Sequence, residues 1–186
     1  MAPVGVAVPS ARMPRTDILD TILAQWTEER PDLDCSPIAV MGRVARVARM
    51  LESFYQQSFE PFGLSPSEFW LLAELRRVGD PHQLTPTELR RTLIRSSGGI
   101  TKVLDRLERE GLLKRRPDAS DRRGSLVQLT AKGRRLIDKA LTAHIANEHE
   151  LLAPMPLAER AALADLLREL SLVFETWRAE RGIQTS

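Results

Sequence analysis

The sequence predicts a mainly helical fold of the α+β class, in which a winged helix-turn-helix is flanked by N- and C-terminal dimerisation helices. Three observations predict it. Helix-start signals recur along the chain, the apolar residues between them repeat every three or four positions, and a ribbon of two short strands follows residues 98–110. A winged helix-turn-helix places one helix in a DNA major groove and the tip of its ribbon against the backbone or the minor groove.

The helix starts share one chemistry, a capping hydroxyl residue followed by proline. Ser36 precedes Pro37 at the first of them. At Ser65–Glu68 and Thr85–Glu88 a carboxylate also stands at the third helical position, which completes a capping box. Because cap, proline and glutamate fall in register twice, these two starts are specific signals.

The spacing of apolar residues gives the extent of each helix. In the second helix, Val40, Val44 and Val47 begin a stripe with steps of four and three residues. The predicted helices are, in chain order, 16–29, 37–59, 67–78, 86–94, 98–110, 131–152 and a last helix that ends near residue 180. The predicted strands, 112–116 and 125–129, form a hairpin with a longer loop.

The chain is long enough for one domain with its own core. Residues 1–14 are rich in Pro and Ala and are expected to be a disordered tail, whereas residues 15–186 are expected to form a single unit. Within that unit, residues 16–60 would supply dimerisation and a ligand pocket, 63–130 the winged helix-turn-helix, and 131–182 further dimerisation helices. The terminal helices carry more apolar surface than a small monomer needs, so we expect them to interlock with a second copy in a two-fold homodimer.

Composition favours a cytoplasmic protein. No apolar run approaches the ~20 residues that a membrane span needs. The N-terminal segment lacks the basic region and the long apolar core of a signal peptide. A single cysteine, Cys35, excludes an internal disulfide framework and fits a reducing compartment. We therefore expect a cytoplasmic, nucleoid-associated protein that does not bind membranes.

Positive charge is concentrated in one part of the chain. Residues 87–135 contain 14 Lys and Arg against 6 Asp and Glu, a net charge of +8, whereas the whole chain carries only +2. A localised basic patch gains free energy from counterion release when it binds duplex DNA. A solvated charged surface is the ordinary explanation of such a run, but its coincidence with the helix, turn, helix and ribbon favours DNA as the partner.

Residues at the start of the helix 98–110 are the first candidates for contact with DNA. Ser96 or Ser97 caps this helix in the prediction, and Gly98 lets the backbone approach a phosphate closely. Farther along, the polar side of the helix carries Thr101, Lys102 and Arg106. Lys102 and Arg106 can reach guanine or phosphate, and Thr101 can contact a thymine methyl group or a base edge. The apolar residues Ile100, Val103, Leu104 and Leu107 are expected to face the core.

The ribbon tip supplies the second group of candidates, Arg122 and Arg123. Asp105 would repel phosphate, so it is expected to have a partner within the protein. One assignment pairs Arg123 with Asp105 or Asp121 and leaves Arg122 free to enter a narrow minor groove, whose negative potential attracts arginine. The swapped assignment stays open.

The motif SSGGxTxxLDRLExxGLLxRxPDxxDRRGxxVxLTxxG, which begins at Ser96, resembles the MarR family of bacterial transcription regulators. The resemblance covers about residues 37–180, and its element DRRG (Asp121–Gly124) is quite specific. It implies a triangular homodimer in the cytoplasm that binds promoter DNA near its own gene. The two-fold symmetry of the expected dimer matches a pseudo-palindromic operator. The resemblance also implies repression that a small molecule relieves, often a phenolic or aromatic acid.

The extra helix that ends in WTEERPDLD is similar to the branch of this family that includes urate-responsive regulators. That branch uses a Trp on the extra helix, an Asp after the GLxP turn and two arginines around the reading helix. Trp26 and Arg115 match, whereas Trp70 replaces the Asp and Val103 replaces the first Arg. These replacements favour a bulkier aromatic carboxylate over urate. Arg43, Arg46 and Arg49 lie close together on the long helix, and one of them could pair with the carboxylate. The candidate ligand residues are therefore Trp26, Arg43, Arg46 and Trp70, and Arg115 is kept as a DNA contact.

Other functions have weaker support. A ligand-independent architectural winged-helix protein stays open, as does a redox regulator based on Cys35, although Asp32 and Asp34 disfavour its thiolate. His144 and His149 are five residues apart, which is not the spacing of a helical metal site. No phosphate-binding glycine loop, nucleophile elbow or zinc-hydrolase motif is present. We expect no catalytic residues, no cofactor and no metal.

Overall fold

The computed structural model describes residues 16–92, 99–117 and 125–183. The chain divides into two compact units, an N-terminal one that ends at Phe54 and a C-terminal one that begins at Tyr55. No helix in the described part of the chain is long and apolar enough to cross a membrane.

The N-terminal unit consists of α1 (Ile18–Glu29) and most of α2 (Pro37–Phe59). Asp17 caps α1, and Asp20 returns a hydrogen bond to the cap backbone, so the two form a capping box. Leu19 is the buried residue of α1, and its side chain lies against Gly42 of α2. The predicted range 37–59 for the second helix is confirmed.

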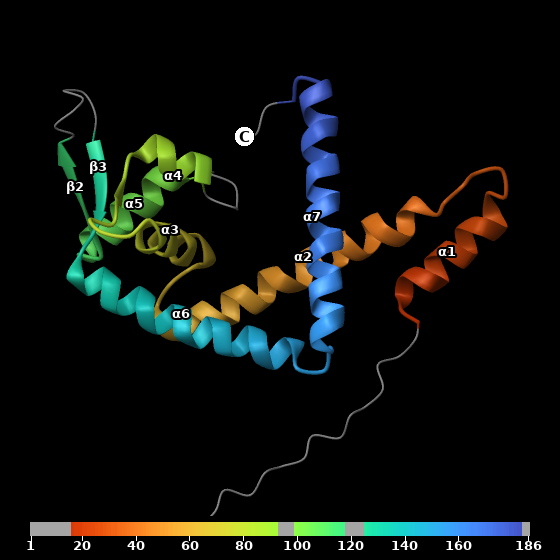
Figure 1. Cartoon of the computed structure of the whole chain (residues 1–186), viewed down its shortest axis with the longest axis horizontal. Helices are drawn as coiled ribbons and strands as arrows, with labels where there is room; N and C mark the ends of the chain where they lie inside the picture. The colour runs from red at the N-terminus through yellow and green to blue at the C-terminus, as the bar shows by residue number, and fades with distance from the viewer. Residues whose placement is uncertain (1–15, 93–98, 118–124, 184–186) are drawn as a thin grey trace, which may run out of the picture. The chain divides into compact units, whose positions relative to one another are not determined.

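The C-terminal unit contains the winged helix-turn-helix. Its elements are, in chain order, the 3-10 helix η1 (Glu60–Phe62), α3 (Pro66–Arg77), β1 (Gln83–Leu84), α4 (Pro86–Thr92), α5 (Ile100–Arg109), β2 (Leu113–Pro117), β3 (Ser125–Leu129), α6 (Ala131–Leu152) and α7 (Leu157–Glu180). Figure 1 shows α3, α4 and α5 grouped beside the strands, and α3 packs on α6 while α5 packs on β2.

The core of this unit is built from the inward faces of these helices and of the sheet. Its fully buried side chains include Phe59, Phe69, Leu72, Leu75, Leu89, Leu107, Leu113, Val127 and Ile137. The capping box at Ser65 is present, because its hydroxyl accepts from the backbone N–H of Glu68 and the Glu68 carboxylate accepts from the backbone N–H of Ser65. The corresponding pair of contacts forms between Thr85 and Glu88. Both helix starts therefore lie where their capping motifs predict them.

The sheet has three antiparallel strands in the order β1-β3-β2, so the prediction of a two-stranded ribbon is incomplete. The missed strand, β1, pairs Gln83 with Gln128 and Leu84 with Val127 of β3. Two residues are too few to show an alternating pattern, and their pairing partners lie more than forty residues away in the sequence. Only the tertiary fold brings this strand to the edge of the hairpin.

Several helix ends also differ from the prediction by one or two residues: α1 begins at Ile18 instead of residue 16, α3 covers Pro66–Arg77 instead of 67–78, and α5 ends at Arg109 instead of residue 110. α5 begins at Ile100 instead of residue 98, with Gly99 at the cap position in the left-handed region (φ 84°) and no side-chain cap. Glycine takes the left-handed conformation without steric cost, and this conformation prevents the helix from starting before residue 100. The described part of α4 ends at Thr92, and the predicted residues 93 and 94 lie outside the described ranges.

Candidate nucleic-acid interface and ligand-site residues

The helix α5 has a buried apolar face and an exposed polar face, as predicted. Ile100, Leu104 and Leu107 are buried in the core, and Val103 is partly buried against it. This orientation leaves Thr101 and Lys102 on the exposed side of the helix. A helix held in this way can present its polar side chains to the major groove.

The third predicted contact on α5, Arg106, is engaged within the chain. Its Nη1 lies 3.0 Å from a carboxylate oxygen of Glu68, and its Nη2 donates to the carbonyl oxygen of Gly63 at 3.1 Å. Its Nε donates to Glu110 at 3.0 Å. The hydrogen bond to Glu110 and the nearby charge of Glu68 raise the pKa of the guanidinium above its ordinary value. In this geometry Arg106 does not present its donors to a base edge.

Arg115 is likewise held, by two carboxylates of α5. Its Nη2 donates to Asp105 at 2.6 Å and its Nη1 to Glu108 at 2.9 Å, while its backbone N–H also donates to Glu108. The expectation that Asp105 has a partner within the protein is confirmed, but the partner among the described residues is Arg115 of β2. The sequence pointed to Arg122 or Arg123 because these lie in the basic wing motif.

Several predicted contacts lie outside the described residues. They are Ser96, Ser97 and Gly98 before α5, and Arg122 and Arg123 in the segment between β2 and β3. Their contacts with DNA stay predictions from the sequence.

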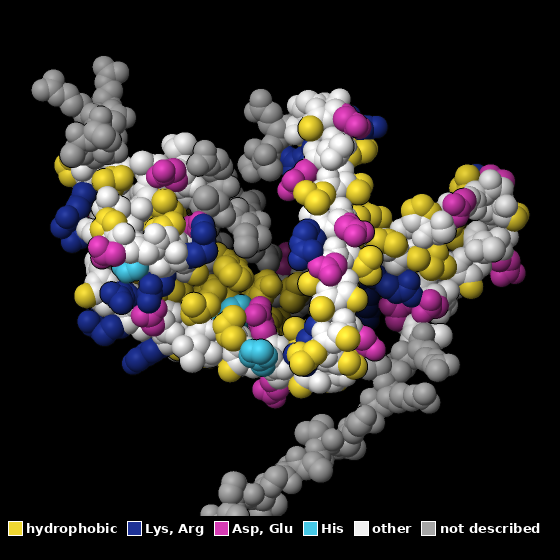
Figure 2. Space-filling model, in the orientation of Figure 1, with side chains coloured by type: hydrophobic (Ala, Val, Ile, Leu, Met, Phe, Trp, Pro, Cys, Tyr) yellow, Lys and Arg dark blue, Asp and Glu magenta, His cyan; other side chains and the backbone are white. Residues whose placement is uncertain are grey.

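Further basic side chains surround the strands and the start of α6. Figure 2 shows Lys and Arg gathered over β2 and the beginning of α6. Lys114 and Arg116 flank Arg115 on β2 and point to the opposite face of the strand. Arg134 and Arg135 are exposed on the first turn of α6. The basic segment found in the sequence is therefore largely a surface feature.

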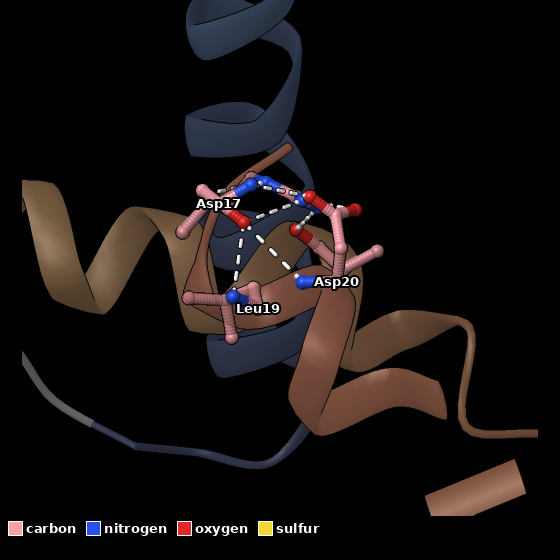
Figure 3. Close-up of polar contacts among 5 residues, drawn as sticks. Asp17, Leu19 and Asp20 are labelled. Atoms are coloured by element: carbon pink, nitrogen blue, oxygen red, sulfur yellow. Dashed lines mark hydrogen bonds and ion pairs between the residues drawn. The ribbon is translucent and has the colours of Figure 1, made fainter. Parts of the chain in front are cut away.

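Among the candidate ligand residues, Arg43 has in-chain partners. Its Nη2 lies 2.9 Å from Asp17 and 2.8 Å from Asp20, and its Nη1 donates to the carbonyl oxygen of Ala39. Figure 3 shows the two carboxylates at the start of α1. The backbone hydrogen bond at Asp17 and the Arg43 contact lower the pKa of Asp20 below its ordinary value. The guanidinium thus joins α1 to α2, whereas Arg46 is exposed one turn later.

Trp26 is exposed to 46%, on the same unit. A surface depression of about 390 Å³ beside it is lined by Gln25, Glu28 and Glu29. Two glutamates repel an anion, so this depression alone does not suit an aromatic carboxylate.

Trp70 belongs to the C-terminal unit and is part of a cluster of rings. It lies edge-on to Tyr55 at 5.5 Å, to Phe69 at 5.1 Å and to His144 at 5.8 Å between ring centroids. Its indole Nε1 is buried and makes no hydrogen bond within the described structure. A buried donor without an acceptor is costly, and an oxygen of a small molecule would remove that cost.

The surroundings of His144 and Cys35 do not indicate a metal site. The imidazole is buried, with its Nε2 3.1 Å from Glu148, and burial lowers its pKa despite that carboxylate. Cys35 is a half-buried free thiol between α1 and α2. Within the described ranges, no three His, Cys, Asp or Glu side chains form a group that could hold a metal ion.

Two functional partners were not found from the sequence, Glu68 and Glu108. Glu68 was recognised as a helix cap, but its contact with Arg106 spans 38 residues of sequence. Glu108 lies seven residues from Arg115, and neither helical nor strand periodicity relates residues in two different elements. No local signal could have identified either contact.

Three comparisons with known proteins relate this geometry to a family. The model of the MarR family matches residues 62–124. The HTH-type transcriptional regulator PecS of Dickeya dadantii is 38% identical over 146 residues, which are 78% of this chain and 88% of that protein. A relative with this identity and coverage shows the family.

Solved structures show the same fold. A MarR family transcriptional regulator from Streptomyces coelicolor, solved in complex with DNA, has a TM-score of 0.67 at 20% identity and covers 75% of this chain and 88% of its own. An organohalide-sensing transcriptional regulator, solved in the 2,4-dichlorophenol-bound form, has a TM-score of 0.64 at 20% identity, with coverages of 74% and 80%. The relatives are transcriptional regulators and not enzymes, and with PecS and the family model they lead to one conclusion: the chain belongs to the MarR family of DNA-binding transcriptional regulators.

Proposed function

We propose that this regulator is a homodimer that represses transcription at a pseudo-palindromic operator and is released by a small aromatic or phenolic acid. Its place of action would be the cytoplasm, at the nucleoid, where promoter DNA is found. The observation that carries the proposal is the orientation of α5, whose buried face leaves Thr101 and Lys102 exposed within the most basic part of the chain. Ser96, Ser97, Gly98, Arg122 and Arg123 would add contacts to the DNA backbone and the minor groove.

The homodimer is supported by apolar surface that a single chain leaves uncovered. No residue of the 24-residue helix α7 is buried. Its exposed apolar side chains include Leu157, Leu163, Leu166, Leu167, Leu172, Val173, Phe174 and Trp177. Contiguous apolar surface of this kind marks an interaction site, and a two-fold dimer would set two copies of α5 about one DNA turn apart.

The ligand would use aromatic and cationic groups that the chain keeps available. Each unit offers candidate groups of its own: Trp26 and Arg46 are exposed on the N-terminal unit, and the Nε1 of Trp70 is a buried donor on the C-terminal unit. Arg43 would have to exchange Asp17 or Asp20 for the ligand. A ligand that binds better to the dimer with misplaced reading helices would weaken operator binding five- to 150-fold for a coupling of ~1–3 kcal/mol.

A ligand-independent architectural protein is the second candidate. The glutamates beside Trp26 and the ion pairs of Arg43 favour it, because both disfavour an organic anion at these positions. Such a protein would bind duplexes with little sequence preference.

Fluorescence anisotropy separates these functions. A labelled duplex from the region upstream of the gene is titrated with protein at fixed physiological salt, against a scrambled duplex, with and without a pool of aromatic acids. The proposal expects tight binding to the upstream duplex that the pool abolishes. Equal and salt-sensitive binding to both duplexes would support the architectural candidate, since phosphate contacts carry no sequence information.

A further inference from the structure

Arg106 is bound by three acceptors of its own chain, although it lies on the polar side of the reading helix. We propose that Arg106 does not read DNA but positions α5 against the start of α3 through Glu68. This inference rests on the proposed sequence-specific binding by α5. It assigns base reading on the described part of this helix to Thr101 and Lys102.

The contacts of the guanidinium join three parts of the C-terminal unit. Nη1 lies 3.0 and 3.1 Å from the two carboxylate oxygens of Glu68 at the start of α3. Nη2 donates to the carbonyl of Gly63 directly after η1, and Nε donates to Glu110 at the end of α5 itself. Each of the three nitrogens therefore has an acceptor, and a planar fork of this kind fixes direction as well as distance.

Glu68 is a rigid anchor for this contact. Its side chain is 3% exposed. Its carboxylate also accepts from the backbone N–H and the hydroxyl of Ser65, both at 2.8 Å. The capping box thus fixes the carboxylate at the first turn of α3, and a buried carboxylate needs a cationic partner. Arg106 is that partner, so loss of either charge disturbs the alignment of the two helices.

The position of Arg106 on α5 explains why the sequence predicts a DNA contact. It follows Lys102 by four residues, so both lie on one side of the helix. Arg106 is directed to α3 and the turn before it, whereas Lys102 is exposed. Lys102 and Arg106 differ in their contact partners, and the spacing of residues along the helix does not reveal those partners.

The charge-neutral variant Glu68→Gln distinguishes the two roles by the sign of its effect. Glutamine still serves as the third residue of a capping box, so the variant removes the charge and keeps the cap. If Arg106 positions α5, this variant weakens binding to DNA although residue 68 is buried. If Arg106 reads DNA, release of its guanidinium leaves binding unchanged or tightens it.

The probe is a duplex selected from a random library by the wild-type homodimer, with a scrambled duplex for comparison. We expect Glu68→Gln and Arg106→Gln each to weaken binding to the selected duplex about tenfold or more, as loss of a good base contact would. The double variant should bind the selected duplex with about the affinity of the more impaired single variant, because both substitutions remove the same contact. Neither variant should change the slope of log K against log salt, because no phosphate contact is lost.

Arg106→Lys keeps the test decisive if Arg106→Gln does not fold. One ammonium group cannot bridge three separate acceptors in the guanidinium geometry, so we expect a loss like that of Arg106→Gln. Affinity equal to wild type for Arg106→Lys, or a salt slope smaller by about one unit per subunit for Arg106→Gln, would overturn the inference in favour of a phosphate contact.

Two matched controls complete the design. Arg30→Gln removes an ion pair with Asp32 in which both side chains are exposed, and it should bind as wild type. Lys102→Ala should weaken binding and relax the sequence preference. If the wild type selects no sequence at all, the proposed sequence-specific function fails, which is a different result from a failure of the Arg106 inference.

Discussion

At the scale of single residues, His144 is a titratable group buried among aromatic rings. It lies in the ring cluster with Tyr55, Phe59 and Trp70, and burial lowers its pKa from the ordinary 6.5. The neutral imidazole fits this apolar environment, whereas the protonated form loses hydration, and the attraction of Glu148 offsets only part of that loss. The unfolded chain therefore binds the proton more readily than the folded one.

This difference makes folding stability depend on pH. Stability from the neutral imidazole is fully present above the unfolded pKa, near 6.5, and is lost as the pH falls through the lower folded pKa. We expect the urea midpoint to fall between about pH 7.5 and pH 5.5 and to fall less in His144→Gln. His149→Gln, exposed on the same helix, is the control and should keep the wild-type dependence. Identical pH profiles for all three proteins would contradict this account.

The limit of sequence reasoning at this scale is the identity of contact partners. The exposed side of α5 and the caps at Ser65 and Thr85 could be predicted, because they depend on neighbours within four residues. The carboxylates of α1 that bind Arg43, and the contacts of Arg106 with Glu68 and Gly63, could not be predicted, since they lie 23 to 43 residues away in the sequence. The contact partner of a basic side chain depends on the tertiary fold. A residue that binds DNA and a residue that only stabilises the fold therefore cannot be told apart in the sequence.

At the scale of elements, the docking of α6 depends on the absence of one side chain. Thr130 caps this helix, and its hydroxyl accepts from Gly133. A Cβ on Gly133 would lie 2.0 Å from the backbone carbonyl oxygen of Leu112. Backbone can move away only if α6 separates from the turn after α5.

Gly133→Ala should therefore destabilise the protein by roughly 2 kcal/mol or more, the cost of overpacking a site that cannot relax. Gly42→Ala is the matched control, because its Cβ would meet the flexible end of the Leu19 side chain at 2.5 Å. The higher helix propensity of alanine, by about 1 kcal/mol, offsets part of that contact. Urea denaturation measures both, and an equal loss in the two variants would refute the distinction.

The predicted elements divide according to how local their signals are. The ranges of α2 and α6 are correct because a cap and a long apolar stripe lie within each segment. The strand β1 was missed because two residues carry no periodicity and its stability comes from β3. The start of α5 was shifted by two residues because the left-handed conformation of Gly99 is not encoded in an apolar pattern.

At the scale of the whole molecule, the uncovered helix α7 determines what a single chain can do. Leu166 and Val173 are each 63% exposed. They lie seven residues apart and therefore on one face of the helix. The proposed function requires that a second copy of the chain covers this apolar face of α7.

Leu166→Glu together with Val173→Glu should convert the protein to a monomer, because a charge placed at the centre of an apolar interface loses its hydration. Sedimentation equilibrium should then give the mass of one chain where the wild type gives two. Val78→Glu alters an isolated exposed apolar residue at the end of α3 and should leave the dimer intact. If the wild-type protein sediments as a monomer, the proposed binding of a two-fold dimer to a pseudo-palindromic operator is wrong.

The ring cluster around Trp70 also has an optical consequence. The protein contains three tryptophans, of which Trp26 and Trp177 are exposed to 46% and 47% and Trp70 is enclosed by other rings. Emission from Trp70 should therefore occur at shorter wavelength than emission from the exposed Trp26. The short-wavelength emission therefore reports on the ring cluster alone, so loosening of this cluster can be followed in the native protein without attaching a dye.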